Sequence, residues 1–102
     1  MVKNEIVEVD LHIHELLDDT TGMGNAEMLN YQLDVFRKTL EEYKQKKGQR
    51  IVFIHGKGDG VLRRAILDEL KRKYKTYQCR MLLSVNMVWG YNGYNSLKIW
   101  ER

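Results

Sequence analysis

The chain has 102 residues, of which 43% are hydrophobic and 30% charged, a size and composition typical of one globular domain. No apolar run approaches the roughly 20 residues that a membrane helix needs, and the alternating start of the chain does not look like a secretory signal, so we expect a cytoplasmic protein without a membrane partner. Seventeen Lys and Arg against fourteen Asp and Glu give a formal charge of +3 and a pI near 9.0, which is compatible with a polyanionic partner.

The start of the chain predicts a strand. Apolar and polar side chains alternate over residues 7–14, the period of two that strands have. Asp10, His12 and His14 would then lie on the same side of it. Two glycines with several Asp and Thr give residues 15–25 the composition of a loop, and Asn25 is expected to cap the helix that follows.

Two amphipathic helices are predicted, one on each side of a short apolar strand. The first helix should end near residues 46–48, and the second should follow the HGKGDG segment with Asp59 as its N-cap. Between them, residues 51–54 are apolar without alternation, as in a strand covered on both faces of a parallel sheet. The two helical stripes consist of Ala26, Leu29, Leu33, Phe36, Leu40 and Tyr43, and of Leu62, Ala65, Ile66, Leu70 and Tyr74.

The last part of the chain predicts two more strands, over residues 76–84 and 96–100, joined by a Gly- and Asn-rich aromatic connection. The single cysteine, Cys79, lies in an apolar-leaning segment and is expected to be a buried thiol. Alternating strands and helices imply that the first two strands run parallel through a right-handed crossover. This is an α/β fold with its first strands parallel.

The parallel arrangement brings two distant motifs to one edge of the sheet. Asp10 and His12 end the first strand, while His55 follows the second, and the carboxyl ends of strands are where open α/β sheets bind ligands. The two imidazoles could act as general acid and base on a phosphodiester. Asp10 could orient an imidazole, bind a metal or activate water. His14 lies further into the loop and is less expected to take part.

The glycines of HGKGDG admit two interpretations. Gly56 and Gly58, with Lys57 between them, could let the backbone approach a phosphate at the start of the helix. From the spacing alone, a tight turn between strand and helix that requires a positive φ is equally expected, and His55 beside the loop favours the phosphate contact. The segment matches neither a Walker A loop nor a GxGxxG fingerprint, so no nucleotide cofactor is expected.

Cations and aromatics near these motifs could contact nucleic acid. Lys57, Arg63 and Arg64 lie at or just after the glycine loop, where they could bind phosphates, although a solvated helix face is the alternative. In the late connection, aromatic rings could stack on unpaired bases or pack on the edge of the sheet. These rings belong to Trp89, Tyr91 and Tyr94.

The sequence does not predict a tightly bound metal. HExxH and cysteine-based motifs are missing from the sequence, which argues against a resident zinc ion. Asp10, His12, His14 and His55 have the ligand types for a loosely recruited ion, magnesium or manganese.

Two motifs resemble the Smr (small MutS-related) domain, found at the C-terminus of many MutS-related proteins. VDLH over residues 9–12 is similar to the family's LDLH(G) motif, and IHGKGDGVLRRAILDEL is similar to its HGxG signature and the helix after it. The resemblance implies a two-layer β-α-β-α-β-β sandwich with a mixed four-stranded sheet over residues 1–102. Both an excised C-terminal domain of a longer protein and a complete small protein remain open.

The resemblance also implies a function and a site. Several family members are nicking DNA endonucleases or RNA endonucleases, and the family's acidic and histidine positions fall on Asp10, His12 and His55. The expected partner is RNA or single-stranded or structured DNA. A noncatalytic nucleic-acid or ribosome-binding module, or a protein-interaction domain, remains the alternative. Ile13 stands where the family usually has Gly, and Tyr94-Asn95-Ser96 stands where it has small residues, which affects substrate fit.

Overall fold

The computed structural model describes residues 6–46, 48–56, 60–86 and 91–101, and only the backbone of residues 83–86 and 91–95. The predicted order of strands and helices is confirmed, with one short additional helix after the first strand. Along the chain the elements are β1 (Ile6–Asp10), α1 (Ile13–Leu16), α2 (Asn25–Glu42), β2 (Arg50–Ile54), α3 (Val61–Lys73), β3 (Tyr77–Asn86) and β4 (Tyr91–Glu101).

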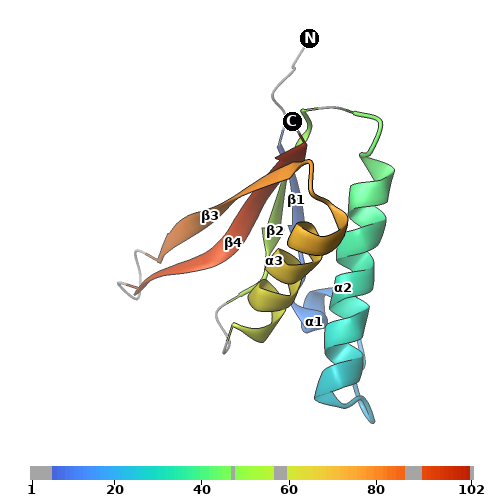
Figure 1. Ribbon diagram of the computed structural model, residues 1–102. Coiled ribbons are helices and arrows are strands. Elements are labelled where there is room, and N and C mark those ends of the chain that lie inside the picture. Colours follow the sequence, from blue (N-terminus) through green and yellow to red (C-terminus); the bar gives the residue numbers. More distant parts are fainter. Residues whose placement is uncertain (1–5, 47, 57–59, 87–90, 102) are drawn as a thin grey trace.

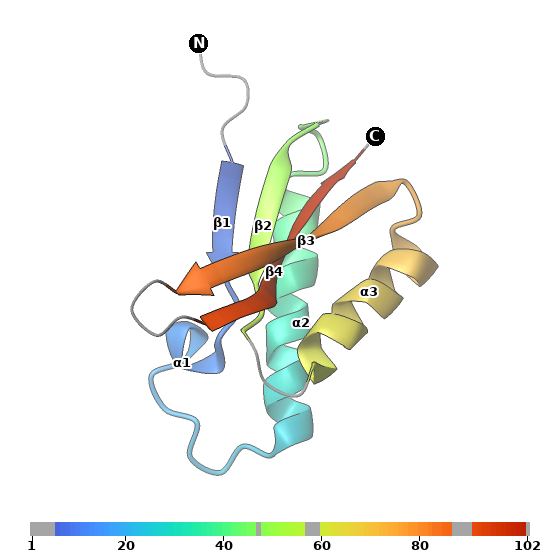
Figure 2. The ribbon, with the colours of Figure 1, turned by 90° about the vertical axis from the view of Figure 1, so that its left-hand side faces the viewer.

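The four strands form one mixed sheet in the order β1-β2-β4-β3. β1 runs parallel to β2, with Ile6 opposite Arg50 and Asp10 opposite Ile54, whereas β4 is antiparallel to both β2 and β3. Helices α2 and α3 lie on the same side of the sheet, and the β3–β4 hairpin extends toward the other side (Figure 1). Figure 2 shows the sheet from that other side, with the helices behind it. The predicted two-layer α/β sandwich with parallel first strands is confirmed.

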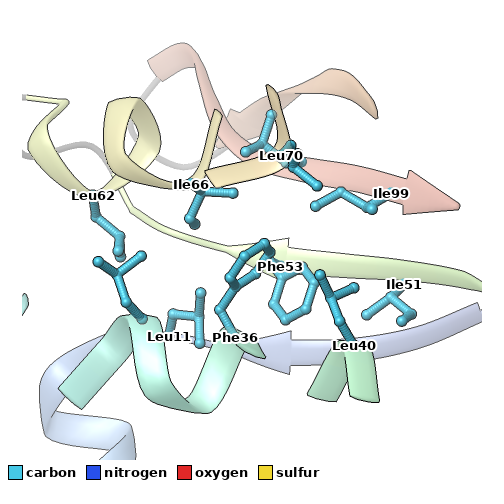
Figure 3. Close-up of a cluster of buried hydrophobic side chains, with 11 residues drawn as sticks. Leu11, Phe36, Leu40, Ile51, Phe53, Leu62, Ile66, Leu70 and Ile99 are labelled. Carbon is cyan, nitrogen blue, oxygen red and sulfur yellow. The ribbon is translucent and has the colours of Figure 1, made fainter. Parts of the chain in front are cut away.

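The hydrophobic core lies between the sheet and the two helices (Figure 3). At its centre Phe36 of α2 and Phe53 of β2 pack edge to face, with ring centroids 4.9 Å apart. Burial of each such side chain stabilises the folded state by about 1.5–3 kcal/mol, so the two apolar stripes hold both helices against the sheet. The other members of the buried cluster are Leu11, Leu33, Leu40, Ile51, Leu62, Ile66, Leu70, Leu97 and Ile99.

A buried ion pair also joins α2 to α3. The Glu69 side chain is only 8% exposed. Its carboxylate accepts hydrogen bonds from Nε of Arg37, at 2.8 Å, and from Nη2 of the same guanidinium, and Nζ of Lys73 lies 3.6 Å from its second oxygen. The hydrogen bond to Glu69 is the main reason why the pKa of Arg37 is raised. Because an unpaired buried carboxylate would be costly, this pair couples the orientations of the two helices.

Strand β1 is shorter than the alternating pattern predicts. The strand ends at Asp10, one further ladder bond joins Leu11 N–H to the carbonyl of Ile54 at 2.9 Å, and the chain then turns into α1 with His12 as its N-cap. His14 therefore lies in α1, exposed. The prediction that Asp10, His12 and His14 share one side of a strand is wrong, because the turn after Leu11 interrupts the period of two.

Several smaller boundaries also differ from the predictions. Gly24, rather than Asn25, is the N-cap of α2, and α2 ends at Glu42, before the predicted residues 46–48. Asp59, the predicted cap of α3, lies outside the described residues.

The prediction that the Cys79 thiol is buried is wrong. Cys79 is exposed, because it lies on β3, which is an edge strand of the sheet. Within the described residues, no helix combines the length and apolar character needed to cross a membrane.

Candidate active site

Asp10 and His12 form a hydrogen-bonded pair at the carboxyl end of β1. Oδ1 of Asp10 accepts a bond from the His12 backbone N–H at 2.9 Å and lies 2.6 Å from Nδ1 of the same residue. The backbone bond fixes the carboxylate, and the carboxylate in turn fixes the ring. With Asp10 ionised, Nδ1 is the donor, and Nε2 is therefore the ring nitrogen left to contact a ligand. The side chains of His12 and Asp10 are 51% and 39% exposed, so solvent and substrate can reach the pair.

Gly56 provides the surface on which the His12 ring rests. A Cβ atom placed on Gly56 would lie 2.4 Å from Nε2 of His12, a distance that real Cβ atoms do not adopt. The residue also has φ of +76°, a conformation that favours glycine. The positive φ is thus confirmed at Gly56 as one of the two interpretations of this turn, and the phosphate contact stays a prediction. Its missing side chain has a second consequence, which is to leave room for the imidazole that comes from β1.

His55 presents the second imidazole from the end of β2. Its Nδ1 lies 2.8 Å from the carbonyl oxygen of Gly56. Because a carbonyl oxygen only accepts, Nδ1 carries the proton and Nε2 carries a lone pair. Nε2 is buried and makes no hydrogen bond within the part of the chain that the structure describes. Buried polar atoms normally have a partner, so this nitrogen is a natural contact point for a ligand.

The environment of His55 favours the neutral ring. Burial lowers the pKa of its imidazole below the ordinary value, and the hydrogen bond to the Gly56 carbonyl opposes that effect in part. The positive charge of Arg63, and that of His12 when its ring is protonated, lower the pKa further. A neutral imidazole with a free lone pair at physiological pH can accept a proton.

A pocket of about 380 Å³ opens beside His55 and Gly56. Arg63, at the start of α3, contributes its positive charge to this pocket, and its predicted contact with a phosphate stays a prediction. Arg64 is exposed one position further along α3 and is not among the lining residues. Besides His55, Gly56 and Arg63, the pocket is lined by Ile13, Asn25, Met28, Leu29, Gln32, Gly60, Val61 and Leu62.

The remaining predicted contacts fall outside the described part of the site. Lys57, Gly58 and Trp89 lie outside the described residues, and so do the side chains of Tyr91 and Tyr94 in β4. Their predicted contacts with phosphates and bases stay predictions.

The predicted magnesium or manganese ion also stays a prediction. Among the described residues, no group of three or more His, Cys, Asp or Glu side chains could hold a metal ion. In addition, Oδ1 of Asp10 is already engaged by His12. The described side chains therefore do not make a metal site by themselves.

The residues that α2 contributes were not predicted from the sequence. Nε2 of Gln32 donates a 2.7 Å hydrogen bond to the carbonyl of Leu11, which ties α2 to the segment between Asp10 and His12. Asn25 and Gln32 are seven positions apart, about two helical turns, and thus lie on the same face of the first half of α2. In the sequence, the signal for this contribution of α2 is the pair of amide side chains seven positions apart, next to the apolar stripe.

Comparison with known proteins places the chain in a family. The model of the Smr domain family matches residues 19–86, a segment that contains α2, His55 and Gly56 and begins downstream of Asp10 and His12. Comparisons with curated proteins and with solved structures gave no match. Because the match extends over more than half of the 102 residues, the chain belongs to the Smr domain family.

Proposed function

We propose that this Smr domain binds nucleic acid and cleaves RNA, with Asp10, His12 and His55 as the catalytic residues. The proposal rests on a pair of imidazoles that both contact Gly56. One ring is oriented by a carboxylate, and the other has a lowered pKa and a buried, unpartnered nitrogen. Family membership supports a nucleic-acid substrate.

In the proposed reaction, His55 acts as the general base. Its Nε2 takes the proton from a ribose 2′-hydroxyl, and the 2′-oxygen forms a bond to the adjacent phosphorus. The bond from phosphorus to the 5′-oxygen of the next nucleotide breaks. His12 donates the proton from its Nε2 to that leaving oxygen, which yields a 2′,3′-cyclic phosphate and a 5′-hydroxyl.

Asp10 supports this step by orienting His12. A carboxylate that accepts from Nδ1 fixes the ring and stabilises the imidazolium that must carry the second proton. Arg63 supplies positive charge beside His55, where the phosphate gains negative charge during the reaction. General acid and base catalysis typically contributes about 10²–10⁴-fold to the rate, which sets the loss expected when either histidine is removed.

The experiment compares His12→Ala and His55→Ala with His14→Ala, which removes a nearby exposed imidazole in α1. Binding to a single-stranded RNA is measured by fluorescence anisotropy, and cleavage is followed on a denaturing gel. We expect binding to persist in all three variants, while the first two lose cleavage by about 10²-fold or more and His14→Ala cuts like the wild type.

Unchanged cleavage in His55→Ala would refute the assignment. Salt-sensitive binding by the wild-type protein with no cut product, on RNA and DNA alike, would instead identify a noncatalytic nucleic-acid-binding module.

A further inference from the structure

We infer that the pocket beside His55 binds a single unpaired nucleobase, the base of the nucleotide whose 2′-hydroxyl attacks the adjacent phosphorus. The inference rests on the proposed function and names its substrate class as RNA that is unpaired at the cleavage site. It is carried by the pocket's dimensions, its lining, and its place relative to His55 and His12.

The size of the pocket suits one nucleotide. Its volume of about 380 Å³ is near the lower end of the range of about 300–1,000 Å³ for small-molecule sites. A base that stays in a duplex is held in its stack and must be extruded to enter such a pocket. RNA that is already unpaired presents its bases without that cost.

The walls combine apolar side chains with amides. Ile13, Met28 and Leu29 supply apolar surface from α1 and α2, against which a flat aromatic ring can lie. Gln32 uses its Nε2 on the carbonyl of Leu11, so its Oε1 is the atom available to accept from a base. Asn25, exposed at the start of α2, adds a donor and an acceptor.

The position of the pocket assigns it to the nucleotide on the 5′ side of the cut. His55 and Gly56 both line the pocket, while the His12 ring rests against Gly56. A ribose whose base occupies the pocket therefore presents its 2′-hydroxyl to His55. The leaving 5′-oxygen then lies toward His12, and the next nucleotide lies outside the pocket.

The test uses DNA oligonucleotides that contain one ribonucleotide, so that only one position carries a 2′-hydroxyl. The base is removed either from that ribonucleotide or from its 3′ neighbour. Cleavage is measured on these substrates, and affinity is measured on all-deoxy analogues that cannot undergo the transesterification. We expect removal of the base of the ribonucleotide, here called the 5′ base, to lower both kcat/KM and affinity roughly tenfold or more. Removal of the base of its 3′ neighbour should have little effect.

Variants of the pocket identify where the base is bound. Met28→Trp fills the pocket and should make the protein insensitive to removal of the 5′ base, whereas Tyr31→Trp, on the same helix but not among the lining residues, should not. Asn25→Ala, compared with Asn30→Ala, tests the amide contact with two substitutions of exposed residues that leave the core intact.

Equal cleavage and equal affinity with and without the 5′ base would overturn the inference, but would not contradict the proposed nuclease activity. If the wild type cuts no substrate but still binds the analogue with the 5′ base about tenfold more tightly than without it, the base site stands and the nuclease fails.

Discussion

Substitution of Gly56 by Ala should disable the site while leaving the fold in place. The Cβ atom of the alanine would lie 2.4 Å from Nε2 and 3.0 Å from Cδ2 of His12, so the ring must move. Rotation of the ring also breaks its 2.6 Å contact with Oδ1 of Asp10. Cleavage should therefore fall by about 10²-fold or more, as expected for loss of a general acid.

The effect on stability can be separated from the effect on the ring. A non-glycine residue in the left-handed region costs about 1–2 kcal/mol. Gly48 has φ of +80°, and a methyl group added there would meet no atom within 4 Å, so Gly48→Ala carries the backbone cost alone. The Asp10–His12 pair is about half exposed and contributes under about 1 kcal/mol. The two variants should thus differ little in their free energies of unfolding.

Urea denaturation measures the two stabilities, and ¹H–¹⁵N spectra of the imidazoles report on His12 directly. We expect the His12 resonances to shift in Gly56→Ala and not in Gly48→Ala, together with the loss of cleavage. An unshifted His12 and full cleavage in Gly56→Ala would refute the packing of His12 on Gly56.

Three further predictions concern the carboxylates and the half-buried imidazole of His55. Asp10→Asn should keep RNA affinity in an anisotropy assay but lose cleavage by about 10²-fold or more; wild-type cleavage would show that the carboxylate does not act through the ring. Glu69→Ala should lower the free energy of unfolding, measured in urea, by about 2 kcal/mol. This is below the range of about 3–5 kcal/mol for broken buried pairs, because Arg37 is partly exposed. The control Asp68→Ala, at an exposed neighbouring carboxylate, should cost under about 0.5 kcal/mol, and equal losses in the two variants would contradict the role of the buried pair. Because the pKa of His55 is lowered from 6.5 in the folded state, the unfolded chain binds more protons, and the free energy of unfolding should fall as the pH drops below about 6.5. Urea titrations at a pH of about 7.5 and about 5 should show a smaller fall in His55→Gln, and an identical fall would contradict the burial of that ring.

The fold could be predicted from the sequence because its main signals are local. The apolar stripes on α2 and α3 and the apolar run of β2 indicate which side chains are buried. Burial of apolar surface is the dominant favourable term in folding. The end of β1 could not be predicted in this way, since the alternation of side chains continues through His12 into α1. The turn there depends on contacts with distant residues, such as the bond from Gln32 to the Leu11 carbonyl.

The site was partly predictable for the same reason. Parallel pairing of β1 and β2 is enough to bring His12 and His55 to one edge, and the structure has both rings beside Gly56. The pocket was not predictable, because one of its walls comes from residues of α2 that carry no chemical motif. The positive φ of Gly56 was one of two interpretations of the sequence, but the contact of Gly56 with His12 depends on how β1 and β2 are placed in three dimensions.

One cleavage assay decides whether Asp10, His12 and His55 form a phosphodiester-cleaving site. Purified protein is incubated with end-labelled single-stranded RNA and with supercoiled DNA, with and without magnesium or manganese, beside an Asp10→Ala/His55→Ala variant. We expect that the wild type cuts the RNA and leaves a 2′,3′-cyclic phosphate, while the variant does not cut. RNA that is bound but left intact under every condition would show that these residues do not form a cleaving site.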